Sequence, residues 1–545
     1  MPIMSQDAEV AELQERYDTE YEVGEDNIHP FGLDLHNPVF LWSAILIVIF
    51  VAGSMLFPDI SKTALTGARD WVINTFDWLF LSAGNFFVLF CLALIVLPFG
   101  RIRLGGQDAE PAFSRMSWFA MLFAAGMGIG LMFWSVAEPV GYFTEWAGSP
   151  LNVAGGTDAA RTAAMGAVMY HWALHPWAIY GVVALSLAFF AYNKGLPLAI
   201  RSVFYPLFGD RVWGPLGNVI DTLAVVATIF GLATSLGFGA QQAAGGMQFL
   251  FGIADSLMVE ILIIAGVTAV ALVSVVRGID GGVKLLSNIN IMLAGLLLLF
   301  VIITGSVMGF FASLGTTVAG YAEYLLPLSN PVGREDETFY HSWTIFYWAW
   351  WISWSPFVGM FIARVSRGRT VREFLTAVLI VPMVVTAIWM SAFGGSGLDQ
   401  AVNGVGSLAN GISDSSLSLF HMLENLPLAG VTSFLAITLV LVFFITSSDS
   451  GSLVIDTITA GGKTEAPVAQ RVFWCVAEGL IAAALLVVGG AEALSALQAA
   501  AVTTGLPFTL VLLLMCVALL KGLNHELQLL RAEEKSAGVT ARQGA

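Results

Sequence analysis

Long apolar runs, separated by short segments rich in glycine, proline and charge, dominate this 545-residue sequence. Most are long enough for a helix to cross the hydrocarbon core of a bilayer, which takes roughly 20 residues. Because backbone polar groups in lipid must be satisfied within the segment, such runs are typical of transmembrane helices. The pattern predicts twelve, at 38–58, 71–99, 116–140, 163–192, 215–248, 255–276, 284–312, 342–365, 372–396, 428–450, 470–491 and 498–520.

The cations between these runs predict an orientation. If both termini are cytoplasmic, only Lys62, Arg69, Arg161 and Arg334 of the 23 lysines and arginines fall in external segments. Cytoplasmic loops of membrane proteins are enriched in these residues. We therefore expect a multi-pass protein of the inner (plasma) membrane with both ends inside.

Composition and charge agree with a membrane domain at 38–520 between two short tails. Hydrophobic residues make up 57% of the chain and charged residues 11%, with a mean hydropathy of +0.80. So few charges do not cover the surface of a soluble protein of this size. The formal net charge is −16. The N-terminal tail, 1–37, is acidic, and its first 28 residues predict a solvated, disordered leader that is either solubilising or regulatory.

Two external segments are longer than the rest. Residues 313–341 mix apolar and acidic positions and predict an amphipathic helix at the interface. Residues 395–427 are rich in glycine, serine and asparagine and predict a loop.

Residues that interrupt helices occur in the third and eighth runs. Gly126, Gly128 and Gly130 alternate in the third, where each glycine costs about 1 kcal/mol relative to alanine. They favour either local unwinding or close packing against a neighbouring helix. Ser355-Pro356 lies mid-way along the eighth run, and proline removes a backbone hydrogen bond. The two runs open consecutive blocks of five, and matched interruptions indicate a transporter's central site.

Aromatic residues of the eighth run share one helical face, which includes Trp350, Trp351 and Trp354. Tryptophan also collects in interfacial belts, but these three run toward mid-membrane, which favours a binding face. The fourth run adds further rings around Pro176. An aromatic cage suits a trimethylammonium group, each ring contributing about 0.5–2 kcal/mol. His171, beside these rings, is interpreted as a hydrogen-bonding residue rather than a proton carrier.

Hydroxyl groups form the remaining pattern. Thr228, Thr234 and Ser235 lie in the fifth run, and Thr446 and Ser447 in the tenth. Neutral oxygens beside unwound carbonyls suit sodium, a hard cation. Serine and threonine also bond within membrane helices, so both interpretations stay open.

With these segments in hand, the chain resembles the betaine/choline/carnitine transporter (BCCT) family over about residues 38–520. The segments that carry the resemblance are Gly126–Gly130 with Glu138-Pro139, His171–Tyr180, Ser353–Gly359, Arg364–Arg369 and Thr446–Ser450. The resemblance implies an all-α polytopic membrane protein with a five-plus-five inverted-repeat (LeuT-like) core. The repeats would span about 116–312 and 342–520, preceded by two extra helices, and the protein would be a homotrimer in the lipid bilayer.

The resemblance also implies secondary active uptake of a quaternary-ammonium or related onium osmolyte, glycine betaine foremost, by sodium symport with alternating access. It implies no enzyme activity, no nucleic-acid partner, and no cofactor beyond sodium as the coupling ion. The implied substrate-binding residues are Trp172, Trp177, Tyr180, Trp350, Trp351, Trp354, Ala125, Gly126, Ile129, Gly130 and Ser235. The implied gating residues are Phe133 and Phe357.

The implied sodium ligands carry one departure from the family pattern. A first site would use Ala124, Met127, Phe443, Thr446 and Ser447, and a second would use Thr228 and Phe357. Leu232 stands where sodium-driven relatives have a second threonine, so the number of ions is open. Gly130 is intact, whereas proton-coupled choline carriers tend to have aspartate there, which favours sodium and a betaine-like substrate. The C-terminal tail, 521–545, is shorter and less basic than the tail helix of osmosensing relatives.

Several alternatives remain at this stage. Within transport they are uptake of choline or dimethylsulfoniopropionate and sodium-independent, carnitine-type exchange. An intramembrane protease would need paired catalytic residues, whereas Asp221, Asp449 and Glu478 are scattered singly. A channel would more often have a re-entrant filter repeated by symmetry, and the sequence contains no such repeat.

Overall fold

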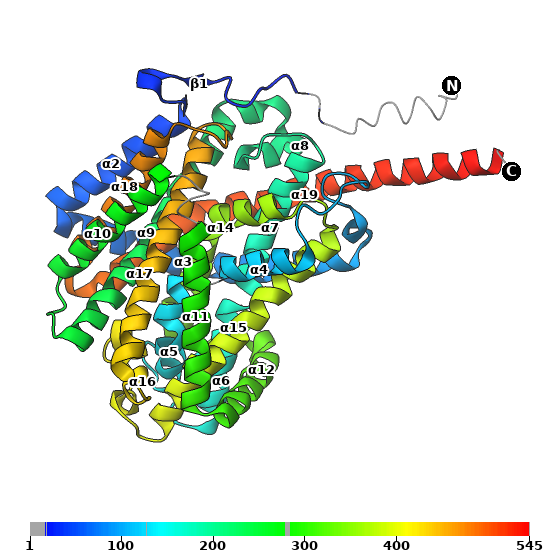
Figure 1. Cartoon of the computed structure of the whole chain (residues 1–545). Coiled ribbons are helices and arrows are strands. Elements are labelled where there is room, and N and C mark those ends of the chain that lie inside the picture. Colours follow the sequence, from blue (N-terminus) through cyan, green and yellow to red (C-terminus); the bar gives the residue numbers. More distant parts are fainter. Residues whose placement is uncertain (1–16, 18, 127, 278–283, 544–545) are drawn as a thin grey trace.

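The computed structural model describes residues 17, 19–126, 128–277 and 284–543. The described chain is a bundle of helices with one short antiparallel hairpin, β1 (Asn27–Ile28) and β2 (Leu35–His36) (Figure 1). The α-helices are α2 (Val39–Leu56), α3 (Pro58–Val96), α4 (Arg115–Gly126), α5 (Ile129–Phe143), α6 (Asp158–Trp172), α7 (Leu174–Tyr192), α8 (Tyr205–Phe208), α9 (Pro215–Phe251), α10 (Leu257–Arg277), α11 (Lys284–Gly305), α12 (Val307–Ser329), α13 (Glu337–Phe339), α14 (Ile345–Val365), α15 (Val371–Val402), α16 (Ser418–Glu424), α17 (Ala429–Thr459), α18 (Val468–Gly489) and α19 (Ala493–Gln543).

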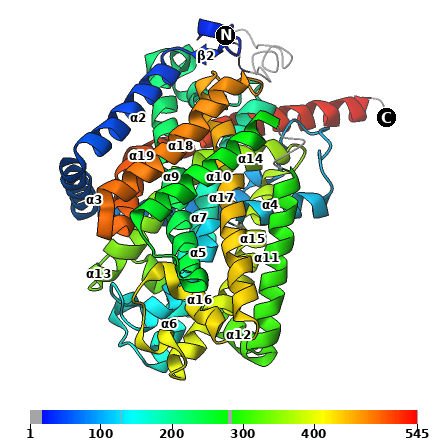
Figure 2. The same ribbon diagram turned by 60° about the vertical axis from the view of Figure 1, so that its left-hand side comes forward.

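Nine helical stretches of the described residues are long and apolar enough to cross a bilayer. An apolar 18-residue segment of the α6–α7 stretch is 94% buried, whereas that of α2 is only 28% buried. Figure 2 shows α7 in the middle of the bundle and α2 at its edge. The number of such stretches is lower than the predicted twelve because of three places in the chain. The third run is broken into α4 and α5, the tryptophans of α14 lower its hydropathy, and α18 and α19 count as one stretch.

The third run is interrupted at its glycines, so the unwinding interpretation is confirmed. Helix α4 ends at Gly126, and α5 begins at Ile129 after Gly128 in extended conformation (φ −167°, ψ −178°). Met127, predicted as a sodium ligand, lies outside the described residues.

The fourth run is interrupted at Ala173, three residues before Pro176. Ala173 (φ −101°, ψ −111°) separates α6 from α7, while Pro176 sits in the first turn of α7, where its missing N–H leaves no helical bond unmade. Because α6 ends at Trp172, carbonyls of its last turn lack helical donors. The carbonyl of His171 instead accepts from Trp351 Nε1 at 2.9 Å, and that of Trp172 accepts from Thr386 Oγ1 at 3.5 Å.

The predicted interruption of the eighth run is wrong. Helix α14 continues through Pro356 from Ile345 to Val365. The Ser355 hydroxyl donates to the carbonyl of Ile352 at 2.7 Å, and this is the carbonyl that the missing N–H of Pro356 would have bound. The serine before the proline therefore keeps the helix intact.

We expect Ser355→Ala to destabilise the protein by about 1 kcal/mol, because a buried carbonyl loses its donor. The measurement is the midpoint of thermal unfolding in detergent, which should fall. Ser353→Ala is the matched control, since the Ser353 hydroxyl lies 3.5 Å from its acceptor, the carbonyl of Ala501. Equal midpoints for the two variants would contradict this account of Pro356.

Four segments outside the predicted membrane helices differ from the prediction. The helix predicted within 313–341 is α12, which begins at Val307, and the predicted loop 395–427 holds the end of α15 and all of α16. The C-terminal tail continues the 51-residue helix α19, which leaves the bundle in Figure 1. At the other end, Tyr21 stacks on Trp213 with ring centroids 4.2 Å apart, so residues 19–28 pack on the body instead of forming a disordered leader.

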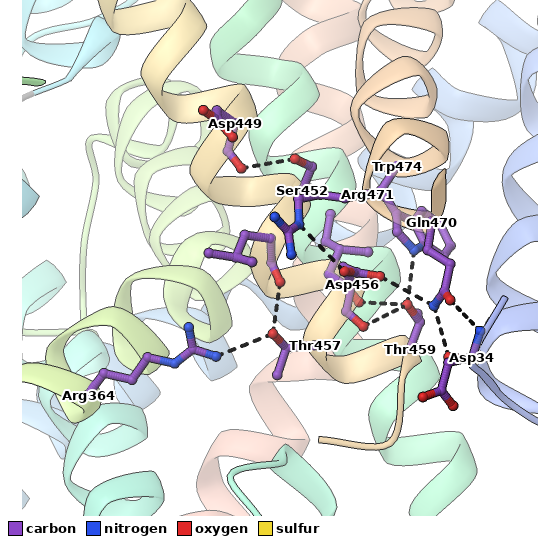
Figure 3. Close-up of polar contacts among 12 residues, drawn as sticks. Asp34, Arg364, Asp449, Ser452, Asp456, Thr457, Thr459, Gln470, Arg471 and Trp474 are labelled. Atoms are coloured by element: carbon purple, nitrogen blue, oxygen red, sulfur yellow. Dashed lines mark hydrogen bonds and ion pairs between the residues drawn. The ribbon is translucent and has the colours of Figure 1, made fainter. Parts of the chain in front are cut away.

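A polar network joins the ends of α14, α17 and α18 to the N-terminal segment (Figure 3). Gln470 Nε2 donates to the carbonyl of Asp34 at 2.9 Å, and Arg364 Nη2 donates to Thr457 Oγ1 at 3.3 Å. Arg471 Nε lies 3.6 Å from Asp456 Oδ2. These contacts fix the segment that precedes α2 against the helical body.

Candidate functional site

A cavity of about 50 Å³ lies where α5, α6, α7 and α14 meet. Its walls consist of aromatic rings and the start of α5. The lining residues are Gly128, Ile129, Gly130, Leu131, Trp172, Pro176, Trp177, Tyr180, Trp350, Trp351, Trp354 and Thr386. Eight of the eleven residues predicted to bind substrate are among them. Of the other three, Ala125 and Gly126 form the last turn of α4, and Ser235 is in α9.

The aromatic rings that line this cavity, here called the cage (Trp172, Trp177, Tyr180, Trp350, Trp351 and Trp354), face it in several orientations. Trp350 and Trp351 are stacked at 4.8 Å with an interplanar angle of 19°, and Trp172 meets Trp351 edge-on at 4.8 Å and 72°. Tyr180 meets Trp351 at 82° and Trp177 at 83°. Rings in several orientations around one small cavity can surround a rounded, methylated cation.

Four tryptophans of the cage each donate a hydrogen bond from the indole N–H to another part of the protein. Trp351 Nε1 donates to the carbonyl of His171, and Trp354 Nε1 donates to the carbonyl of Gly231, both at 2.9 Å. The other two bonds run from Trp172 Nε1 to Glu138 Oε2 (2.6 Å) and from Trp350 Nε1 to Ser235 Oγ (3.2 Å). These indoles are therefore held in place and offer π surface to a ligand.

The first turn of α5 supplies the polar part of the cavity. Its N-cap, Gly128, provides no side-chain acceptor, and the helix begins on the cavity wall at Ile129. Backbone N–H groups of a first helical turn lack partners within the helix and attract negative charge. Aromatic rings, which suit a cation, and the start of a helix, which suits an anion, thus face one small space.

A second cavity, of about 150 Å³, shares Trp354 with the first. Its lining includes Phe357, Phe443, Thr446 and Ser447. Phe357 contacts Trp354 edge-to-face at 5.5 Å and 71°. Three of the five residues predicted for the first sodium site therefore lie together beside the cage. Of the other two, Ala124 belongs to α4, and Met127 is outside the described residues.

Other predicted site residues lie away from both cavities. Thr228 is buried and donates to the carbonyl of Ala224 at 2.7 Å. Thr234 is turned toward α19, where it donates to the carbonyl of Leu497 at 3.0 Å. The second sodium site at Thr228 and Phe357 stays a prediction.

Two more predicted residues lie behind the cage. The hydroxyl of Ser235 donates to the carbonyl of Gly231 at 3.3 Å and accepts from Trp350, so it supports that ring from the far side. Phe133 stacks on Phe238 at 5.0 Å, and neither residue lines a cavity described here.

The sequence interpretation gave no role to Glu138, Tyr347 or Thr386. Thr386 lines the cavity from α15, and its run has no motif that singles it out. Glu138 binds a cage tryptophan, and Tyr347 stacks on Trp351 at 5.7 Å. An ionisable residue within a transmembrane run is rare and is a functional candidate by default, which is the signal that would have found Glu138.

Comparison with known proteins identifies the family. The betaine/carnitine/choline family transporter model matches residues 38–528. Glycine betaine transporter 1 of Vibrio parahaemolyticus is 63% identical over 94% of this chain and 98% of its own length. A glycine betaine/proline/choline/ectoine transporter of the same organism is 59% identical over 94% of this chain and 92% of its own.

Among solved structures, the manganese transporter of Eremococcus coleocola aligns with 74% of this chain and 81% of its own at 16% identity. Its TM-score of 0.38 is too low to inform the fold. The family assignment rests on the sequence matches, which cover nearly the whole chain. The chain belongs to the betaine/carnitine/choline family and is a multi-pass membrane transporter, not an enzyme.

Proposed function

We propose that this protein takes up glycine betaine, or a related onium osmolyte, by sodium symport with alternating access. The single observation that carries the proposal is the cavity in which the cage rings face the first turn of α5. The rings would hold the trimethylammonium group and the amides of α5 the carboxylate, which together fit a small zwitterion. Relatives named as glycine betaine transporters support this substrate.

The second cavity supports the choice of sodium. Thr446 and Ser447 offer hydroxyl oxygens beside the phenyl ring of Phe357, and Trp354 links this space to the cage. Sodium is a hard cation that prefers neutral oxygens of this kind. Phe133 and Phe357 are the proposed gating residues on either side of the substrate.

The proposed arrangement has twelve membrane helices, with both termini cytoplasmic and the protein in the plasma membrane. Ion pairs between distant segments support it, because they join predicted internal segments to internal ones and external to external ones. Internal pairs include Lys463–Asp34, Lys194–Glu526 and Arg101–Glu534, and external pairs include Lys62–Glu492 and Arg161–Asp399. The inverted repeats, 116–312 and 342–520, and a homotrimer complete the proposal.

Other onium compounds are the main competing substrates. Choline has the same cationic head as glycine betaine but no carboxylate, so it leaves the start of α5 without a ligand. Dimethylsulfoniopropionate has both a cationic head and a carboxylate. Sodium-independent exchange of carnitine-like compounds is disfavoured, because Thr446 and Ser447 remain beside the substrate path.

Uptake by the reconstituted protein tests the proposal. Proteoliposomes are loaded with potassium, and uptake of labelled glycine betaine is measured with external sodium or potassium. Choline, carnitine, ectoine and dimethylsulfoniopropionate are measured in parallel. We expect sodium-dependent accumulation of glycine betaine. Equal uptake in potassium would refute symport, and no uptake of any onium compound would refute the substrate class.

We also predict that Thr446→Val raises the sodium concentration for half-maximal uptake about tenfold, the equivalent of about 1.4 kcal/mol, because one oxygen ligand is lost. Thr438→Val is the matched control. Thr438 lies on the same helix and donates to the carbonyl of Phe434 at 2.9 Å, as Thr446 does to that of Val442 at 3.0 Å, but it lines neither cavity. The same sodium dependence in both variants would remove Thr446 from the site.

A further inference from the structure

Glu138 is a fully buried glutamate whose carboxylate receives four hydrogen bonds. It projects from α5, the helix that begins at the cavity. Two donors bind Oε1, namely the Tyr142 hydroxyl (2.8 Å) and His171 Nδ1 (3.0 Å). Two bind Oε2, namely Trp172 Nε1 and the Tyr347 hydroxyl, each at 2.6 Å. Both oxygens of the carboxyl group are thus engaged by side chains of the surrounding helices.

No lysine or arginine is paired with Glu138 among the described residues, whose one ion-pair contact with it is that of His171. Thr344 Oγ1 lies 2.9 Å from His171 Nε2. A neutral imidazole with its hydrogen on Nδ1 fits both contacts, because it donates to Glu138 and accepts from Thr344. In that arrangement the carboxyl group of Glu138 has no cationic partner.

Two of the four residues that are hydrogen-bonded to Glu138, Trp172 and Tyr347, also belong to or contact the cage. The indole of Trp172 lines the cavity and meets Trp351 at 4.8 Å. The ring of Tyr347 lies parallel to Trp351, at 5.7 Å and 17°. A carboxylate that accepts from an indole N–H or a phenol O–H polarises that ring and makes its face more negative. In a dry site, a more negative ring face attracts a cation more strongly.

We propose that Glu138 makes the cage prefer a cationic head group to a neutral one of the same shape. Glu138 is not part of the cavity wall, so it acts through Trp172 and Tyr347 as a positioning and specificity-determining residue. This inference rests on the proposed function, in which the rings hold an onium group. It predicts that Glu138→Gln affects the binding of ligands with a cationic head group more than the binding of ligands with an uncharged one.

The test uses glycine betaine and 3,3-dimethylbutanoate, in which a tert-butyl group replaces the trimethylammonium group and the carboxylate is kept. Binding of each to the purified full-length protein is measured by calorimetry in sodium buffer. We expect Glu138→Gln to weaken glycine betaine binding at least tenfold and binding of the analogue, whose tert-butyl head group is uncharged, less than threefold. Equal losses for both ligands would indicate a merely structural role and overturn the inference.

Glu478→Gln is the matched control for removing a buried carboxylate. Glu478 is also fully buried and accepts from the Ser448 hydroxyl at 2.9 Å, but it lies in α18 and lines neither cavity. We expect its ratio of the two affinities to equal that of the unmodified protein. A ratio that falls as far as in Glu138→Gln would show that the loss of any buried carboxyl group has this effect and would overturn the specific role.

A second pair of variants tests the same inference without touching Glu138, in case Glu138→Gln does not fold. Trp172→Phe and Trp177→Phe each replace a cage indole by a smaller ring, but only Trp172 is bonded to Glu138 among the described contacts. We expect the preference for glycine betaine to fall about threefold further in Trp172→Phe. Equal preferences would overturn the inference. An unmodified protein without any preference for the cation would instead overturn the proposed function.

Discussion

Replacing Trp351 by leucine is expected to lower the kcat/KM for glycine betaine uptake about 100-fold. Trp351 lines the cavity and contacts Trp172 and Trp350, each with ring centroids 4.8 Å apart. Leucine removes a dry cation–π partner worth about 2 kcal/mol and loosens the neighbouring rings, and about 2.8 kcal/mol corresponds to 100-fold. The measurement is initial uptake at several substrate concentrations, normalised to reconstituted protein.

Trp474→Leu is the control for the loss of a buried tryptophan. Its indole is fully buried in α18 and donates to Thr459 Oγ1 at 2.9 Å, but it lines neither cavity. This variant should lose stability while the remaining folded protein keeps its KM. If Trp351→Leu retained the KM of the unmodified protein, the cage would not be the substrate site.

A single methyl group at position 130 is expected to reduce glycine betaine binding at least 30-fold. A Cβ atom on Gly130 would lie 2.7 Å from the ring of Trp350 and 2.8 Å from that of Trp172. Both rings are buried and anchored by their indole N–H groups, so they cannot move aside without losing those bonds. Gly130→Ala should therefore distort the cage, and Gly130→Asp should distort it further.

Gly128→Ala is the matched control two residues away. A Cβ atom there would meet no atom within 4 Å, and the extended backbone accepts any residue. Calorimetric titration of both variants with glycine betaine is the measurement. Similar affinities for the two would show that the space beside Gly130 is not limiting.

Residue types and spacing predicted a face of rings and a helix-breaking motif, and the resemblance to the family supplied the individual members of the cage. Nearly all of its predicted members line one cavity, because a helical face of rings and a helix-breaking motif are both local features of the chain. Proline at 356 was misleading for a similarly local reason. Its effect depends on one hydroxyl bond, from Ser355 to Ile352, whose formation the sequence does not reveal.

Contacts between distant segments were beyond the sequence interpretation. The bonds from Trp172 and Tyr347 to Glu138 join α6 and α14 to α5. Periodicity places a residue on a face of its own helix, but the rotation of that helix against its neighbours is set by packing over the whole bundle. For the same reason, the sequence did not reveal that the hydroxyl of Ser235 accepts a hydrogen bond from Trp350.

The continuity of α14 makes the cavity mechanically asymmetric. One wall is a single helix from Ile345 to Val365, whose proline is bridged by a side-chain bond. The facing walls have joints in the backbone, at Gly128 between α4 and α5 and at Ala173 between α6 and α7. Bending is cheapest where helical hydrogen bonds are already absent. In the proposed alternating access, we therefore expect the tryptophan wall on α14 to stay rigid and the helices with backbone joints to bend.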